Sequence, residues 1–145
     1  MFIPEIPNNS LTEEITQIVE LSKELEDEGY YFKYYPPATE EELTSWENEH
    51  NIKIPESLKD WLRFSDYADI CSELAIIKGV KAFKIDCELV PDEMVIIGEV
   101  IGDGQFIGFS KETGEIMWED HGEVTKLKSF DIFLKDTVIR MLKDS

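Results

Sequence analysis

The sequence predicts an α+β fold, in which an antiparallel-rich sheet is flanked by helices from both ends of the chain. Short apolar segments separated by glycine-containing turns fill residues 94–121, a pattern typical of a β-meander. Apolar residues at helical spacing precede and follow this meander, at about 10–28 and at 130–141. With 145 residues and no repeat or linker, we expect a single domain that spans the whole chain.

The central segment is expected to form three consecutive strands. Residues 94–97 are an apolar run that is too short for a helix and suits a strand buried on both faces. A Gly-Asp-Gly turn at 102–104 leads to a second strand at 105–110. A loop that contains Gly114 leads to a third strand at 115–119. Strands joined by connections this short pair in antiparallel fashion.

A first helix is expected near the start of the chain. Ser10 and Glu13 have the spacing of a capping box that begins a helix, and Gly29 suits the position just after its end. The aromatic segment 30–35 follows, and it either packs beneath this helix or presents an aromatic patch to a partner. The apolar stripe of the helix consists of Leu11, Ile15, Ile18, Val19, Leu21 and Leu25.

Two more helices are expected before the meander. Thr39 and Glu42 have the spacing of a second capping box, and Pro55 suits the first position of a third helix. Between the third helix and the meander, residues 74–77 and 80–85 are expected to form a pair of strands that turn at Lys78 and Gly79. The buried side of the third helix is expected to carry Leu58, Trp61 and Leu62.

The end of the chain is expected to add one strand and one helix. Residues 124–127 follow the meander and suit a last strand. Ser129 is placed to cap the final helix. The apolar positions of that helix are Phe130, Phe133, Leu134, Val138 and Met141.

The net charge of the chain disfavours nucleic acid and anionic membranes as binding partners. There are 32 acidic and 14 basic residues, so the formal net charge is −18. A molecule with this field repels nucleic-acid backbones and anionic membrane surfaces, and we expect it to bind neither. The acidic residues either keep solvated helix faces soluble or steer a basic protein partner into contact.

The compartment is expected to be the cytoplasm. The first nine residues have neither the basic start nor the apolar stretch of a secretory signal, and no apolar run approaches the roughly 20 residues needed to cross a bilayer. Cys71 and Cys87 lack a Cys-x-x-Cys spacing, and we expect them to be free thiols.

The sequence favours a binding function over catalysis. Ile107 stands where a dinucleotide fingerprint needs glycine, so the nearby glycines are expected to serve turns and close strand contacts. No serine or cysteine has a recognisable nucleophile setting, and we expect no catalytic residue, no cofactor and no metal. Adjacent residues of a strand point to opposite faces, which weakens the one conceivable metal set: Asp103, Glu119, Asp120, His121 and Glu123.

The meander at 94–121 and the helical segments before and after it resemble, in this order along the chain, the motifs of the SMI1/KNR4 family, also called the SUKH superfamily. The resemblance covers residues 36–134, while the stretch 63–70 departs from the family in having no glycine. Its outer parts are a two-helix segment at 36–62 and a closing helix that starts at 129. The family-motif positions, which we expect to have structural roles, are Pro55, Gly102, Gly104, Gly114, Trp118, His121 and Phe130.

The resemblance implies, for a small free-standing member, an immunity protein that binds and neutralises a cognate toxin, often a nuclease. The acid excess fits this independently, because carboxylates on a rigid surface can compete for a basic cleft. The alternatives are a regulatory scaffold like the family members associated with cell-wall glucan synthesis, and, third, a metal-dependent hydrolase. The residues expected to contact a partner are Glu99, Asp103, Glu119, Asp120 and Glu123, with Trp46 or Tyr67 as aromatic anchor.

Overall fold

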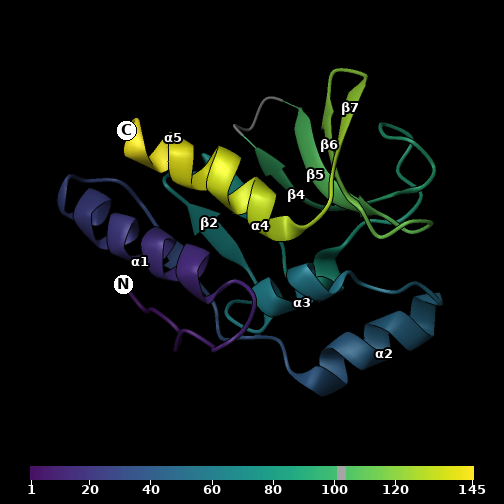
Figure 1. Cartoon of the computed structure of the whole chain (residues 1–145), viewed down its shortest axis with the longest axis horizontal. Helices are drawn as coiled ribbons and strands as arrows, with labels where there is room; N and C mark the ends of the chain where they lie inside the picture. Colours follow the sequence, from purple (N-terminus) through teal and green to yellow (C-terminus); the bar gives the residue numbers. More distant parts are fainter. Residues whose placement is uncertain (101–103) are drawn as a thin grey trace.

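A computed structural model describes residues 1–100 and 104–145 of the chain (Figure 1). One sheet contains seven strands, and each strand pairs in antiparallel fashion with the strand that follows it in the sequence. The predicted α+β fold and its central meander are therefore confirmed. The strands are β1 Lys33–Tyr34, β2 Ala68–Ile70, β3 Ala75–Ile77, β4 Met94–Val100, β5 Gln105–Ser110, β6 Ile116–Asp120 and β7 Glu123–Leu127.

The helices come from both ends of the chain, as predicted. In Figure 1, α1 and the C-terminal helix lie side by side on one face of the sheet, and the two are in contact. The C-terminal helix is continuous, but its middle turn is π-helical. The helical segments are α1 Thr12–Asp27, α2 Glu40–His50, α3 Glu56–Leu62, the 3-10 turn η1 Val80–Ala82, α4 Phe130–Phe133, the π-helical stretch η2 Leu134–Ile139 and α5 Arg140–Lys143.

The start of α1 differs from the prediction. Leu11 occupies the N-cap position and makes no side-chain capping bond. The hydroxyl of Ser10, which the sequence assigned to a capping box with Glu13, instead donates to the Asp60 carboxylate of α3 at 2.5 Å. The predicted capping box is therefore wrong, because a tertiary contact takes the hydroxyl. The predicted end is confirmed, since Gly29 follows the last turn with a φ of 101°.

The ends of the other helices are closer to the prediction. The hydroxyl of Thr39 accepts the Glu42 N–H and the Glu42 carboxylate accepts the Thr39 N–H, so the capping box of α2 is confirmed. Pro55 is the N-cap of α3 rather than its first residue. Ser129 is the N-cap of α4, but its hydroxyl bonds the Asp131 carboxylate, and the Phe130 N–H donates to a hydroxyl of α3 instead.

The strand predicted at 74–77 is confirmed as β3, but the strand predicted at 80–85 and its pairing with β3 are wrong. β3 pairs with β2 on one side and with β4 on the other, and residues 80–82 form the turn η1. Gly79 packs directly on Asp66, where a Cβ atom would lie 2.0 Å from the Asp66 carbonyl oxygen. The Asp66 carboxylate accepts the Val80 N–H at 2.9 Å. These contacts turn the chain away from β3, and Lys84 forms only an isolated bridge with Ile96 of β4. The strand that pairs with β3 instead is β2, from the stretch 63–70.

The sheet is buried on both faces around β4. The face toward the helices carries the main core, which includes Val95 and Ile97 of this strand. On the opposite face Val90 and the loop around it cover a smaller cluster, which includes Met94 and Ile96. The prediction that residues 94–97 form a strand buried on both faces is confirmed, because all four are at most 1% exposed.

The aromatic segment after α1 divides between the core and the surface. Phe32 and Tyr34 are buried, whereas Tyr31 and Tyr35 are 55% and 46% exposed. Tyr30, which an extended strand would place with the buried pair, is 39% exposed because it still belongs to the turn that ends α1. Core packing is therefore confirmed for Phe32 and Tyr34, whereas contact of the exposed tyrosines with a partner stays a prediction.

We predict that Tyr34→Phe lowers the free energy of unfolding by about 1 kcal/mol. The Tyr34 hydroxyl lies 2.6 Å from Ser22 Oγ in the core, and Ser22 donates its own proton to the Ile18 carbonyl. The tyrosine is therefore the donor, and burial raises the pKa of Tyr34 further above its usual range. Urea unfolding measures the change, with Tyr35→Phe as the exposed control. Equal values for both variants would contradict the role of this bond.

A charged network joins α2 to α3. The Arg63 guanidinium donates two 2.8 Å bonds to Glu40 and one 2.8 Å bond to Asp60. Bonding to Arg63 holds the pKa of Glu40 below its usual value. The same contacts raise the pKa of Arg63, so the guanidinium stays charged throughout the ordinary pH range.

We expect Arg63→Gln to lower the free energy of unfolding by about 1 kcal/mol or less at neutral pH, since Glu40 is largely exposed and the pair is screened. A carboxylate whose pKa is lowered by folding contributes stability above its unfolded pKa and loses that contribution as the pH falls through the folded pKa. The difference between wild type and variant should therefore shrink below about pH 4.3. Denaturant unfolding from pH 7 to pH 3 measures this difference in the free energy of unfolding. The control is Lys111→Gln, which removes a different exposed ion pair, with Asp86. A pH-independent difference would contradict this account.

Candidate functional site

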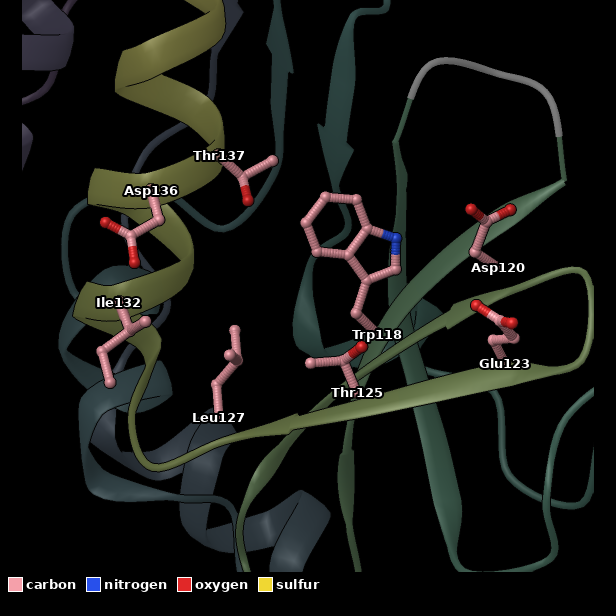
Figure 2. Close-up of a pocket in the computed structure, with 8 residues that line it drawn as sticks. All are labelled: Trp118, Asp120, Glu123, Thr125, Leu127, Ile132, Asp136 and Thr137. Carbon is pink, nitrogen blue, oxygen red and sulfur yellow. The ribbon is translucent and has the colours of Figure 1, made fainter.

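A groove lies between the β6–β7 hairpin and the C-terminal helix (Figure 2). Its volume is about 330 Å³. Strand β7 is the last strand of the sheet, and four of its five residues are exposed, so one side of the groove opens to solvent at the sheet edge. The residues that line the groove are Trp118, Asp120, Glu123, Thr125, Leu127, Ile132, Asp136 and Thr137.

The hairpin turn places the polar groups of the groove. His121 and Gly122 both have positive φ values, 50° and 97°, as the two central residues of a type I′ turn do. This turn sets a register in which Asp120 is opposite Glu123 and Trp118 is opposite Thr125. Because residues two apart on a strand share a face, all four side chains lie on the face toward the C-terminal helix.

Two carboxylates therefore face each other across the hairpin. Directly opposed residues of antiparallel strands have Cβ atoms about 4.5–5.5 Å apart, and like charges in such positions destabilise the sheet. His121 Nδ1 lies 2.6 Å from Asp120 Oδ1, so the imidazole ring engages one of the two carboxylates. In the part of the chain that the structure describes, Glu123 makes no ion pair. Figure 2 shows the Asp120 and Glu123 carboxylates next to each other at one end of the groove.

Trp118 forms the floor of the groove. Its ring packs edge-on against Phe133 of α4, with centroids 6.0 Å apart and an interplanar angle of 83°. Figure 2 shows the indole nitrogen on the side of the ring that faces away from the helix. This nitrogen and Gln105 Oε1 are buried, and neither has a hydrogen-bond partner among the described residues. The helix thus fixes one side of the indole ring, while the rest of the ring contributes to the groove.

The π-helical stretch η2 supplies the opposite wall. Asp136 and Thr137 belong to this stretch and line the groove together with Ile132 of α4. A π-helical turn holds an extra residue compared with an α-helical turn, and such turns are frequent at functional sites. Among the lining residues that the structure describes, three are acidic and none is basic. The groove therefore presents a negative, partly aromatic surface to solvent.

The predicted partner-binding carboxylates separate into two sets. Asp120 and Glu123 line the groove, as described above. Glu99 and Glu119 lie in one row across the opposite face of the sheet, where each is paired with Phe106. Glu119 is only 4% exposed, because its carboxylate turns inward and accepts the Gly122 N–H at 2.6 Å. Asp103 lies outside the described residues.

The two predicted aromatic anchors lie elsewhere. Trp46 is 6% exposed and packs against Phe83 and Phe109, so it is a core residue and lacks the surface that an anchor needs. Tyr67 is half-buried and packs against Tyr35, with ring centroids 5.1 Å apart. This pair lies at the β1–β2 side of the sheet, at the edge opposite β7.

The family-motif residues have local structural positions. Gly104 and Gly114 lie in turns with φ values of 80° and 79°, and Phe130 is fully buried beside Trp61 of α3. Gly102 lies outside the described residues. Pro55, Trp118 and His121 are placed as described above, and of these Trp118 and His121 belong to the groove or its hairpin.

The carboxylates of this hairpin do not form a metal site in the described structure. Glu119 and Asp120 point to opposite faces, as expected of neighbouring residues in a strand. Within residues 1–100 and 104–145, no three His, Cys, Asp or Glu side chains are grouped so that they could hold a metal ion. In the same residues, no helix is long and apolar enough to cross a membrane.

The sequence did not identify five residues of the groove. The missed residues share no motif, and the helix that carries three of them reads as an ordinary amphipathic helix. One signal was available: Ile132 and Asp136 are four residues apart, which places them on one helix face beside the predicted hairpin. The missed residues are Thr125, Leu127, Ile132, Asp136 and Thr137.

Comparison with known proteins agrees with this fold. The sequence profile of the SMI1/KNR4 family (SUKH-1) matches residues 37–136. The matched segment begins after α1 and β1 and includes the other six strands and most of the groove. A search of curated proteins found no match. Since the profile covers more than half of the 145 residues, the chain belongs to the SMI1/KNR4 (SUKH-1) family.

Proposed function

We propose that this chain is an immunity protein, which binds and neutralises a basic protein toxin, of nuclease type, and catalyses no reaction itself. The observation that carries the proposal is the groove, which has three carboxylates, no basic residue among the described lining residues, and an aromatic floor. Family membership supports the same class of function.

The charge of the whole molecule favours this kind of partner. A net charge of −18 attracts a basic protein from a distance and accelerates its association, and salt weakens this attraction. A nuclease active site must hold a polyanion, so it presents the complementary positive surface. An acidic protein that docks there competes directly with the nucleic acid. We propose that the contact centres on Asp120, Glu123 and Asp136, and that it takes place in the cytoplasm.

The proposal is tested by co-expression and by pull-down. The first candidate toxin is any basic nuclease domain that is found to be encoded beside this chain. We expect the chain to restore colony formation of bacteria that express the domain, and to retain the domain on a column at about 50 mM salt but much less at about 500 mM salt. A nuclease that stays fully active at a twofold molar excess of this chain would contradict the proposed function. Equal retention at both salt concentrations would contradict its electrostatic basis.

One observation favours a second candidate, a regulatory scaffold that docks to several proteins. Phe2, Tyr31 and Tyr35 expose about half of their surface near the β1 edge, far across the sheet from the groove. Exposed aromatic residues are typical of protein interfaces. A scaffold with two docking surfaces should lose one partner when Tyr31 and Tyr35 are changed to serine, whereas the immunity protein should protect cells as before. Protection by this double variant therefore distinguishes the two functions.

A further inference from the structure

The groove offers a cation two opposed carboxylates beside an aromatic ring, and it has a third carboxylate on the helical wall. Asp120 and Glu123 stand at one end, Asp136 stands on the helical wall, and Trp118 lies between them (Figure 2). Thr125 adds a hydroxyl opposite Trp118 in the strand register. A volume of about 330 Å³ is large enough for one long side chain but not for a folded element.

We infer that the groove receives an arginine side chain of the protein partner. The inference rests on the proposed function, and it adds the chemistry of the partner residue. A guanidinium is planar, stacks on aromatic rings and donates to two carboxylates at once, and all three properties match what the groove presents. A lysine ammonium can also pair with two carboxylates, as Lys59 does with Glu47 and Glu56, but it is a compact point charge without a planar face to stack on the ring.

The charges around the groove favour the same occupant. The opposed Asp120 and Glu123 repel each other in the free protein, and a cation between them removes that repulsion. The lysines nearest in sequence are engaged elsewhere: Lys126 pairs with Glu93 at 3.2 Å and Lys135 pairs with Asp131 at 3.6 Å. Among the described residues, Asp120 contacts His121 at 2.6 Å, whereas Glu123 and Asp136 make no ion pair and remain available to a group from another molecule.

The test is an NMR titration of the full chain with a short peptide. The chain has three tryptophans, so its spectrum contains three indole N–H signals, and Trp118→Phe identifies the relevant one. The probe is a capped tetrapeptide with two arginines, and the comparison peptide has lysines at the same positions. We expect the Trp118 signal to move on titration with the arginine peptide, and the lysine peptide to bind at least about threefold more weakly.

Matched variants separate a specific site from diffuse attraction. Glu123→Gln with Asp136→Asn should weaken binding of the arginine peptide about tenfold, whereas Glu28→Gln with Asp27→Asn, which removes the same charge at the end of α1, should change it less than twofold. A Trp118 signal that does not move, or equal binding of the two peptides, would overturn the inference. Equal losses in the two double variants would overturn it as well.

The protection assay keeps this inference distinct from the proposed function. If the arginine peptide fails to bind but the chain still neutralises the nuclease, the partner docks on another surface, and only the arginine site is wrong. If the peptide binds in the groove but no protection is seen, the arginine site stands and the immunity function is wrong. Unfolding midpoints of all variants show whether a loss of binding reflects a loss of fold.

Discussion

Replacement of Gly108 by alanine is expected to remove about 3 kcal/mol of folding free energy, which is a large share of the stability of an ordinary domain. Gly108 lies in the middle of β5, between Ile96 of β4 and Met117 of β6. A Cβ atom there would lie 2.0 Å from the Val95 carbonyl oxygen and 3.0 Å from the Met94 methyl group. The backbone oxygen cannot move away without separating β4 from β5, at the centre of the sheet.

Gly114→Ala is the matched control for this variant. Gly114 has a φ of 79°, but nothing lies within 4 Å of the position that its Cβ would occupy. Its replacement therefore costs only the backbone strain, about 1 kcal/mol. Urea denaturation followed by tryptophan fluorescence gives both values. If Gly108→Ala cost no more than Gly114→Ala, the close approach of β4 and β5 described here would be wrong.

Reversal of the two hairpin charges is expected to abolish protection against the toxin. Asp120→Lys with Glu123→Lys places two cations where the proposed partner brings its own, and affinity should fall by at least about 100-fold, because like charges brought together at an interface cost several kcal/mol. Folding should change by no more than about 1 kcal/mol, since the variant loses the exposed Asp120–His121 contact and otherwise replaces one pair of opposed like charges by another. Colony counts and pull-down with the nuclease domain measure the result.

The control for this variant carries the same charge change elsewhere. Asp27→Lys with Glu28→Lys alters one aspartate and one glutamate at the end of α1, where the helix dipole favours cations. It should slow association somewhat through the lower net charge, but leave protection intact. If both double variants protect equally well, the partner does not contact the β6–β7 hairpin, and the proposed contact surface is wrong.

The predicted carboxylate set shows how far strand periodicity can be used. Sequence position suggested one acidic surface around the hairpin, and alternation along β6 already implied that Glu119 and Asp120 face opposite ways. The structure adds that the Glu119 carboxylate accepts the Gly122 N–H of the hairpin turn. The sequence cannot predict that a glutamate carboxylate bonds a backbone N–H of the neighbouring turn, because a surface glutamate and a glutamate that caps a turn occur at the same positions of the strand pattern.

At the start of α1 and in the segment after Lys78, contacts with distant residues override the structure that the local sequence predicts. The capping box at Ser10 satisfied every local rule, yet the hydroxyl bonds Asp60, fifty residues away. The segment 80–85 was expected to form a strand, yet Gly79 packs against Asp66 and the chain turns into η1. In both places a long-range contact offered more favourable bonding than the local pattern did.

The sequence by itself determined the class of fold, the helices at either end, the meander at 94–121 and the negative field of the molecule. These features depend on periodicity, turn residues and net charge, which are properties of neighbouring residues or of simple sums. Only the tertiary structure decided that Asp120 and Glu123 share a groove with Asp136, and that Trp118 forms its floor. The groove is built from a hairpin and a π-helical turn that meet in space, and no local pattern encodes where two such elements come together.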